Sequence, residues 1–286
     1  MTRPRRRPQS NLLTLALSVA LAVTVGAIVY LATTSLPFLA VSPTSDPTFG
    51  ALNECLLSAA PQRVGFAVGR DARRAAAWTN DEVVECREGE AAAVVKLPGA
   101  TVGAYDGRGR LWVAARGPDA GATGLFLLKG GEAHAVGELS PQALAGTREG
   151  VVALEPSGRL VAFSGDGAVT ATRTVAQAGD AALSTSGDGQ RAAVRVGGGL
   201  VALDATTLEV VRAEAPCAVE RLWWLKGGHR VLVGCGPGES WALVLDVDTG
   251  QSEAAPARAR VEALLVGPEG PWVRPCDVLP CTAEEP

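Results

Sequence analysis

Residues 184–194 read Ser-Thr-Ser-Gly-Asp-Gly-Gln-Arg-Ala-Ala-Val, and this stretch decides the fold. A Gly-Asp-Gly turn is followed by a basic residue and then by an apolar run, which together form a β-hairpin signal. The same order returns along the chain. Turns rich in glycine or aspartate precede apolar runs that start at Ala75, Leu111, Val151, Ala192, Val231 and Trp272, which are 36 to 41 residues apart. The chain therefore contains an internal repeat of about forty residues.

Each repeat offers four short strands. A first strand such as Val64–Val68 precedes the turn, a third such as Leu125–Leu128 follows the apolar run, and a fourth such as Ala133–Val136 is more polar. Four short strands in about forty residues are typical of a propeller blade. Five complete blades and the first two strands of a sixth can be counted, so we predict an all-β, six-bladed β-propeller preceded by one transmembrane helix.

Residues 49–59 (FGALNECLLSA) form the one apolar stretch after the linker that the repeat does not use. They could add an outer strand to the sixth blade, which would leave fewer exposed sheet edges. They could equally form a short helix packed on one face.

Three segments carry a family resemblance: Ala162–Gly167 (AFSGDG), Ser184–Val194 and Leu245–Gly250 (LDVDTG). They resemble the PD40 or TolB-like repeats of bacterial β-propellers, and the last is similar to the D-x-x-T-G hairpin of WD40-like blades. The resemblance covers about 210 residues and implies a propeller fold, without implying a specific activity.

The N-terminal segment indicates a membrane anchor. Residues 12–36 form an uncharged apolar run, and a helix of this length would measure roughly 37 Å, enough to cross a hydrocarbon core of roughly 30 Å. A cleaved signal peptide would have a shorter apolar region, and a buried core helix is a further alternative. The basic residues Arg3 and Arg5–Arg7 place the N-terminus in the cytoplasm by the positive-inside rule.

The predicted organisation has four parts: a cytoplasmic basic tail (1–11), a transmembrane helix (12–36), a polar linker (37–48) and a β-propeller domain (49–286). We expect a single-pass protein of the cytoplasmic (inner) membrane. Its C-terminal domain would lie outside the cytoplasm, in the periplasm if the cell is Gram-negative.

All six cysteines follow the predicted anchor, as a disulfide framework in an exported domain would require; they are Cys55, Cys86, Cys217, Cys235, Cys276 and Cys281. Cys217 and Cys235 lie toward the same end of one predicted hairpin, and a small bulge or the Gly234–Gly238 loop must take up the register offset between them before they can pair. Cys276 and Cys281 could pair within the tail, which would leave Cys55 for Cys86. Pairing of Cys55 with Cys276 is the main rival, and buried free thiols are the alternative to any bridge.

Trp223 and Trp224 are adjacent in a predicted first strand, so their side chains point in opposite directions. One of them could face a partner while the other packs in the core. We therefore treat the pair as a candidate partner surface.

No catalytic, cofactor-binding or metal-binding constellation stands out. For the two histidines, His134 and His229, no Cys/His or Ser/His spacing typical of a catalytic pair stands out in the sequence. Asp246-Val-Asp-Thr-Gly250 opens like a calcium loop, but its twelfth position is Ala257, so a β-turn explains it better. We predict no catalytic residue, no cofactor and no metal.

These observations favour a non-enzymatic scaffold or binding module with a protein partner in or near the membrane. After residue 40 the chain has 22 basic and 30 acidic residues, a net charge of −8 (22 − 30), which disfavours nucleic acid. The alternative is an exported propeller enzyme, a lyase, hydrolase or cyclotransferase. Its acids, such as Asp106, Asp166, Asp188 and Asp246, would have to meet at the central channel.

Overall fold

The computed structural model describes residues 40–43, 47–69, 73–116, 123–175, 183–214, 216–225, 228–236, 241–254, 260–265 and 272–274. All of them belong to one compact unit, Phe38–Pro286. Within these ranges no helix has both the length and the apolar character needed to cross a membrane. The predicted tail (1–11), the predicted membrane helix (12–36), Cys276 and Cys281 lie outside the described residues.

Most of the unit consists of five four-stranded antiparallel sheets, each built from four consecutive strands. Sheet 1 contains β2 (Gly65–Val68), β3 (Arg74–Trp78), β4 (Glu82–Arg87) and β5 (Ala93–Lys96), and sheet 2 contains β6 (Val102–Tyr105), β7 (Leu111–Arg116), β8 (Thr123–Lys129) and β9 (Glu132–Glu138). Sheet 3 contains β10 (Ala143–Gly146), β11 (Val151–Leu154), β12 (Arg159–Phe163) and β13 (Val169–Thr174), and sheet 4 contains β14 (Leu183–Thr185), β15 (Arg191–Val196), β16 (Gly199–Asp204) and β17 (Val210–Glu214). Sheet 5 contains β18 (Val219–Trp224), β19 (Arg230–Cys235), β20 (Trp241–Asp246) and β21 (Ser252–Ala254).

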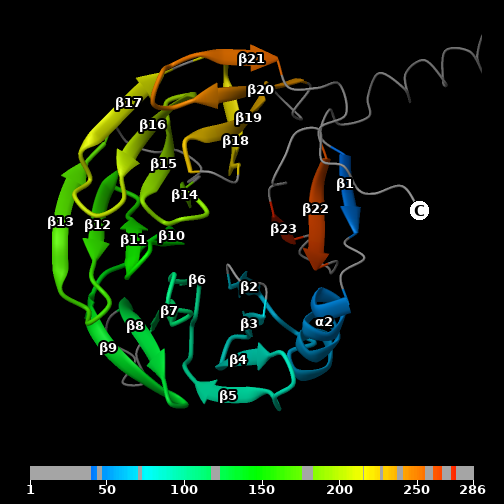
Figure 1. Ribbon diagram of the computed structural model, residues 1–286. Coiled ribbons are helices and arrows are strands. Elements are labelled where there is room, and N and C mark those ends of the chain that lie inside the picture. The colour runs from blue at the N-terminus through cyan, green and yellow to red at the C-terminus, as the bar shows by residue number, and fades with distance from the viewer. Residues whose placement is uncertain are drawn as a thin grey trace, which may run out of the picture. The chain divides into compact units, whose positions relative to one another are not determined.

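The five sheets follow one another around a common axis (Figure 1). Their first strands contact each other in sequence, β2 with β6, β6 with β10, β10 with β14 and β14 with β18. The fourth strands lie at the outside, where most of the side chains of β9, β13 and β17 are exposed or half-buried. This is a propeller-like all-β fold, and at that level the prediction from the repeat is confirmed.

A sixth, smaller sheet has the order β1 (Ala40–Pro43), β22 (Arg260–Leu265) and β23 (Trp272–Arg274). Strand β1 comes from the segment expected to be a linker and pairs in parallel with β22, whereas the strand pairs of the other five sheets are antiparallel. The N-terminal strand in this sheet is therefore 40–43 and not 49–59.

Residues 49–59 belong to a helix, α2 (Pro47–Ala59). Leu52 and Leu56 are one helical turn apart and both are buried against sheet 1, where they meet Ala75, Ala77 and Val84. Helix α2 also contacts β22, so it lies between sheet 1 and the smaller sheet. Of the two possibilities that the sequence left open, the helix is the one found.

Apolar side chains fill the spaces between neighbouring sheets, as in a packed core. Trp112 is fully buried and Trp78 nearly so, which agrees with a packing role for these rings. Trp78 fits only because Gly65 and Gly103 lack side chains, since a Cβ at either position would come within 3 Å of its ring.

Two disulfides brace the unit. Cys55 on α2 is bonded to Cys86 on β4, with an S–S distance of 1.99 Å, so the helix is covalently tied to sheet 1. Cys217 is bonded to Cys235, with a Cα–Cα distance of 5.8 Å, beside a register shift between Val219 and Arg221. That shift is a bulge, which was one of the two ways in which the sequence allowed this pairing.

Candidate functional site

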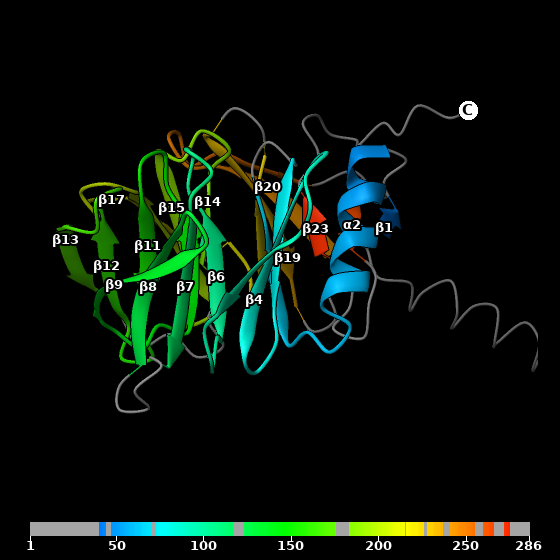
Figure 2. The same ribbon diagram turned by 90° about the horizontal axis from the view of Figure 1, so that it is seen from below.

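Two sets of turns share one end of the five sheets. Because consecutive strands are antiparallel, the turn between the first and second strands ("inner turn") lies at the same end as the turn between the third and fourth strands ("outer turn"). Figure 2 shows strands of several sheets running between the two ends of the unit. We call the end that carries these turns the turn face.

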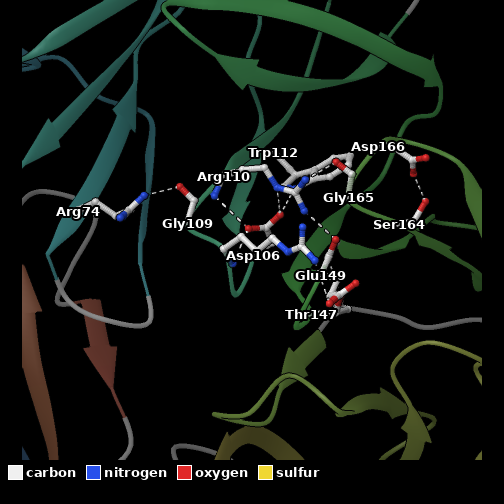
Figure 3. A network of polar contacts seen from close by, with 12 residues as sticks. Arg74, Asp106, Gly109, Arg110, Trp112, Thr147, Glu149, Ser164, Gly165 and Asp166 are labelled. Carbon is white, nitrogen blue, oxygen red and sulfur yellow. Dashed lines mark hydrogen bonds and ion pairs between the residues drawn. The ribbon is translucent and has the colours of Figure 1, made fainter.

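The inner turn of sheet 2 is organised by Asp106, whose side chain is fully buried. Its carboxylate accepts hydrogen bonds from the backbone N–H groups of Arg108 (2.9 Å) and Arg110 (3.0 Å), from Nε of Arg110 (2.7 Å) and from Nε1 of Trp112 (3.1 Å). Figure 3 shows this network. Because these four donors occupy the lone-pair positions of the carboxylate, Asp106 has a structural role in this turn.

One position recurs in all five inner turns. The first residue of each turn donates its N–H to the carbonyl of the residue that opens or directly precedes the second strand, at 2.8 to 3.0 Å. We call the accepting residue the entry position, and in sheets 1 to 5 it is Arg74, Arg110, Gly150, Arg191 and Arg230. In sheets 1, 2, 4 and 5 the basic residue that follows the turn in the sequence therefore occupies a defined structural position.

The entry arginines of sheets 1, 2 and 4 reach across to the next sheet. Arg74 donates from Nη1 to the carbonyl of Gly109 at 2.7 Å, and Arg110 donates from Nη2 to the carbonyl of Glu149 at 2.8 Å and from Nη1 to that of Gly165 (Figure 3). Arg191 lies 3.8 Å from a carboxylate oxygen of Asp248 on sheet 5. These contacts tie neighbouring turns together, a role that the sequence alone did not reveal.

In sheets 3, 4 and 5 the outer turns are closed by their own aspartates, which are Asp166, Asp204 and Asp246. Asp246 accepts the backbone N–H groups of Thr249 (2.8 Å) and Asp248 (3.1 Å), and these bonds, chiefly the one from Thr249, lower the pKa of its carboxyl. This is the β-turn expected for the segment. A hydrogen bond from Ser164 likewise lowers the pKa of Asp166.

The four acids considered for an enzyme are held in four different turns. Asp106 and Asp246 are bound as described above, Asp166 accepts from Ser164, and Asp188 accepts from the hydroxyl of Ser186 and the backbone N–H of Gln190. Among the residues that the structure describes, no three His, Cys, Asp or Glu side chains are grouped as a metal ion would need.

The paired tryptophans differ in burial. Trp224 is 3% exposed, and its Nε1 donates to the carbonyl of Ser184 on sheet 4 at 3.2 Å, so it joins two sheets and offers no partner surface. Trp223 is half-buried. As expected for adjacent strand residues, the pair splits, and Trp223 alone remains available as a contact residue.

A cleft of about 540 Å³ opens on the turn face between sheets 3 and 4. Both turns of each sheet contribute to it, through residues that include Arg148, Gly150, Gln190, Asp204, Ala205 and Thr206. Arg148, Gln190 and Thr206 are exposed to solvent. Its walls are rich in hydroxyls and backbone groups, so it suits a polar ligand or side chain.

The fold resembles those of solved β-propellers, whereas the sequence identity to them is low. A chain in the crystal structure of the mitotic checkpoint complex aligns over 68% of this chain and 64% of that chain, with a TM-score of 0.54 and 12% identity. The present chain therefore spans less than two thirds of the length of that checkpoint-complex chain. The β-propeller domain of Cps50 (Swd1) from Myceliophteria thermophila aligns over 70% of this chain and 76% of that one, with a TM-score of 0.51 and 10% identity. No family model and no curated protein matches the sequence. At these identities the likeness shows a propeller fold alone.

Proposed function

We propose that this protein is a membrane-anchored, exported, WD40-like β-propeller that acts as a protein-interaction scaffold. The observation that carries the proposal is the turn face, where arginines tie successive turns into one surface while a polar cleft stays open between sheets 3 and 4. A surface whose backbone is already fixed loses little conformational entropy when a partner docks.

The proposed location rests on the sequence together with the disulfides. The basic residues before the apolar run 12–36 favour an anchor with the propeller outside the cytoplasm. Two disulfides support an oxidising compartment, because such bonds rarely persist in the cytosol. We further propose that the sheet of β1, β22 and β23 is the sixth blade and that it closes the ring.

Site-specific photocrosslinking in the native host tests the proposal. A photoreactive residue at exposed Gln190 on the turn face should capture a defined membrane-associated protein, in an amount that rises with that protein's expression. The matched control carries the same residue at exposed Ser157, in the turn between the second and third strands of sheet 3 and hence at the opposite end. Equal capture from both positions, or none from Gln190, would contradict a docking role for the turn face.

A further inference from the structure

The entry position of sheet 3 breaks the pattern of the other four sheets. It is Gly150, whereas sheets 1, 2, 4 and 5 have arginine there. An added Cβ at Gly150 would lie 1.9 Å from the carbonyl oxygen of Phe163 in its own sheet. A side chain cannot fit at that point, so sheet 3 sends no entry arginine toward sheet 4.

The two preceding interfaces show what an entry arginine binds. Arg74 uses the carbonyl of Gly109, the residue just before the next entry position, and Arg110 uses the carbonyl of Glu149, which is the equivalent residue one sheet further on. Arg110 also uses the carbonyl of Gly165, the second residue of the next outer turn. Arg110 is thus held by main-chain carbonyls from both turns of the following sheet, and Arg74 by a carbonyl of the inner turn. Arg191 differs, because it pairs with the carboxylates of Asp204 and Asp248.

The same two places exist between sheets 3 and 4. Gln190 directly precedes the entry residue Arg191, and Ala205 is the second residue of the outer turn that begins at Asp204. Both residues line the cleft of about 540 Å³, together with Gly150. The carbonyl of Gln190 accepts one hydrogen bond, from the N–H of Ala205 at 2.9 Å, and a carbonyl can accept a second.

We propose that this cleft binds the guanidinium of an arginine side chain presented by a partner protein, which fills the place that Gly150 leaves empty. This inference rests on the scaffold function proposed above and names the chemistry of one contact. Arginine is favoured over lysine because its planar group can donate to two carbonyls on different turns at once.

The two carboxylates that line the cleft are paired with arginines, and the lining keeps one further positive charge. Glu149 and Asp204 carry negative charge but are paired with Arg108 (3.0 Å) and Arg191 (3.4 Å). Arg148 adds one exposed positive charge to the lining. Recognition therefore depends on hydrogen-bond geometry, and Arg148 opposes the incoming cation.

The test uses the purified full-length protein in detergent and a labelled peptide, acetyl-Gly-Gly-Arg-Gly-Gly-amide, with its lysine counterpart. Fluorescence anisotropy should detect the arginine peptide with a Kd of about 1 mM or lower, and the lysine peptide should bind at least about tenfold more weakly. Thr206→Trp, which places a ring in the cleft from an exposed wall residue, should abolish binding. Arg148→Gln should strengthen it, and low millimolar guanidinium chloride, but not sodium chloride, should compete.

Thr172→Trp on β13 is the matched control, because Thr172 is exposed and does not line the cleft. Thermal unfolding of both variants checks that they fold. Arginine-peptide binding that survives Thr206→Trp, equal binding of the two peptides, or binding of inorganic phosphate in place of the peptide would overturn the inference. If a partner still crosslinks at Gln190 while the peptide does not bind, the scaffold function stands and the arginine site is wrong.

Discussion

At the residue scale, Asp106 stabilises the inner turn of sheet 2 because it is the shared acceptor of Arg110 and Trp112. Asp106→Ala would leave the indole N–H of Trp112 and a partly buried guanidinium without that acceptor. We expect the free energy of unfolding to fall by about 2–3 kcal/mol, measured by urea titration. Arg108→Ala, which removes an exposed ion pair with Glu149, should cost less than about 0.5 kcal/mol. Similar losses for the two variants would contradict the role assigned to Asp106.

Tyr105 should make stability depend on alkaline pH. Its hydroxyl is buried and donates to Glu85 at 3.0 Å, and burial, followed by the charge of Glu85, raises the pKa of Tyr105 well above its ordinary value. The folded state therefore favours the neutral phenol. This stabilisation is complete below the unfolded pKa of about 10 and is lost as the pH rises beyond it.

Urea titrations of the wild type and Tyr105→Phe between pH 8 and pH 11 measure this effect. The difference in free energy of unfolding between the wild type and the variant should stay constant up to about pH 10. Above that pH the wild type should lose roughly 1.4 kcal/mol per pH unit relative to the variant. A difference that stays flat to pH 11 would show that Tyr105 ionises as easily in the folded state as in the unfolded chain.

At the element scale, the β18–β19 hairpin is held by the Cys217–Cys235 disulfide across a separation of 18 residues. Replacing both cysteines with serine should lower the free energy of unfolding by about 3 kcal/mol, because the unfolded chain regains loop entropy. The double variant at Cys276 and Cys281 is the control, since a bridge there would close a much shorter loop. Non-reducing peptide mapping should recover Cys55 with Cys86 and Cys217 with Cys235, and free thiols at both Cys217 and Cys235 would reject the pairing.

The sequence could predict the elements that are signalled by residues close to one another in the chain. The second strands are continuous apolar runs after glycine-rich turns. Their positions, such as the runs that start at Ala192 and Val231, could therefore be predicted from the local sequence. Strand β1 was missed because Ala40–Pro43 looks like a linker and pairs with β22, more than two hundred residues away. The arginine ties were missed because their acceptors are backbone carbonyls, which carry no sequence signal; the recurrence of a basic residue before the second strand was the available clue.

At the scale of the whole molecule, orientation in the membrane decides whether the turn face can meet an external partner. Arg3 and Arg5–Arg7 are the only charged residues in the first forty, and positive charge resists translocation. A reporter that is active only outside the cytoplasm, fused after Pro286, should therefore be active. Changing all four arginines to glutamate should reduce that activity and expose the N-terminus to external protease in part of the population.

The same fusion separates an anchor from a cleaved signal. An intact N-terminus that stays with the membrane after carbonate extraction supports the anchor, whereas a soluble exported product that begins after residue 36 supports cleavage. Reporter activity confined to the cytoplasm would reject export. It would also leave Cys55–Cys86 and Cys217–Cys235 in a reducing compartment, where such bonds rarely persist. Topology and disulfide state are thus linked, and the two measurements must agree for the propeller to lie outside the cytoplasm.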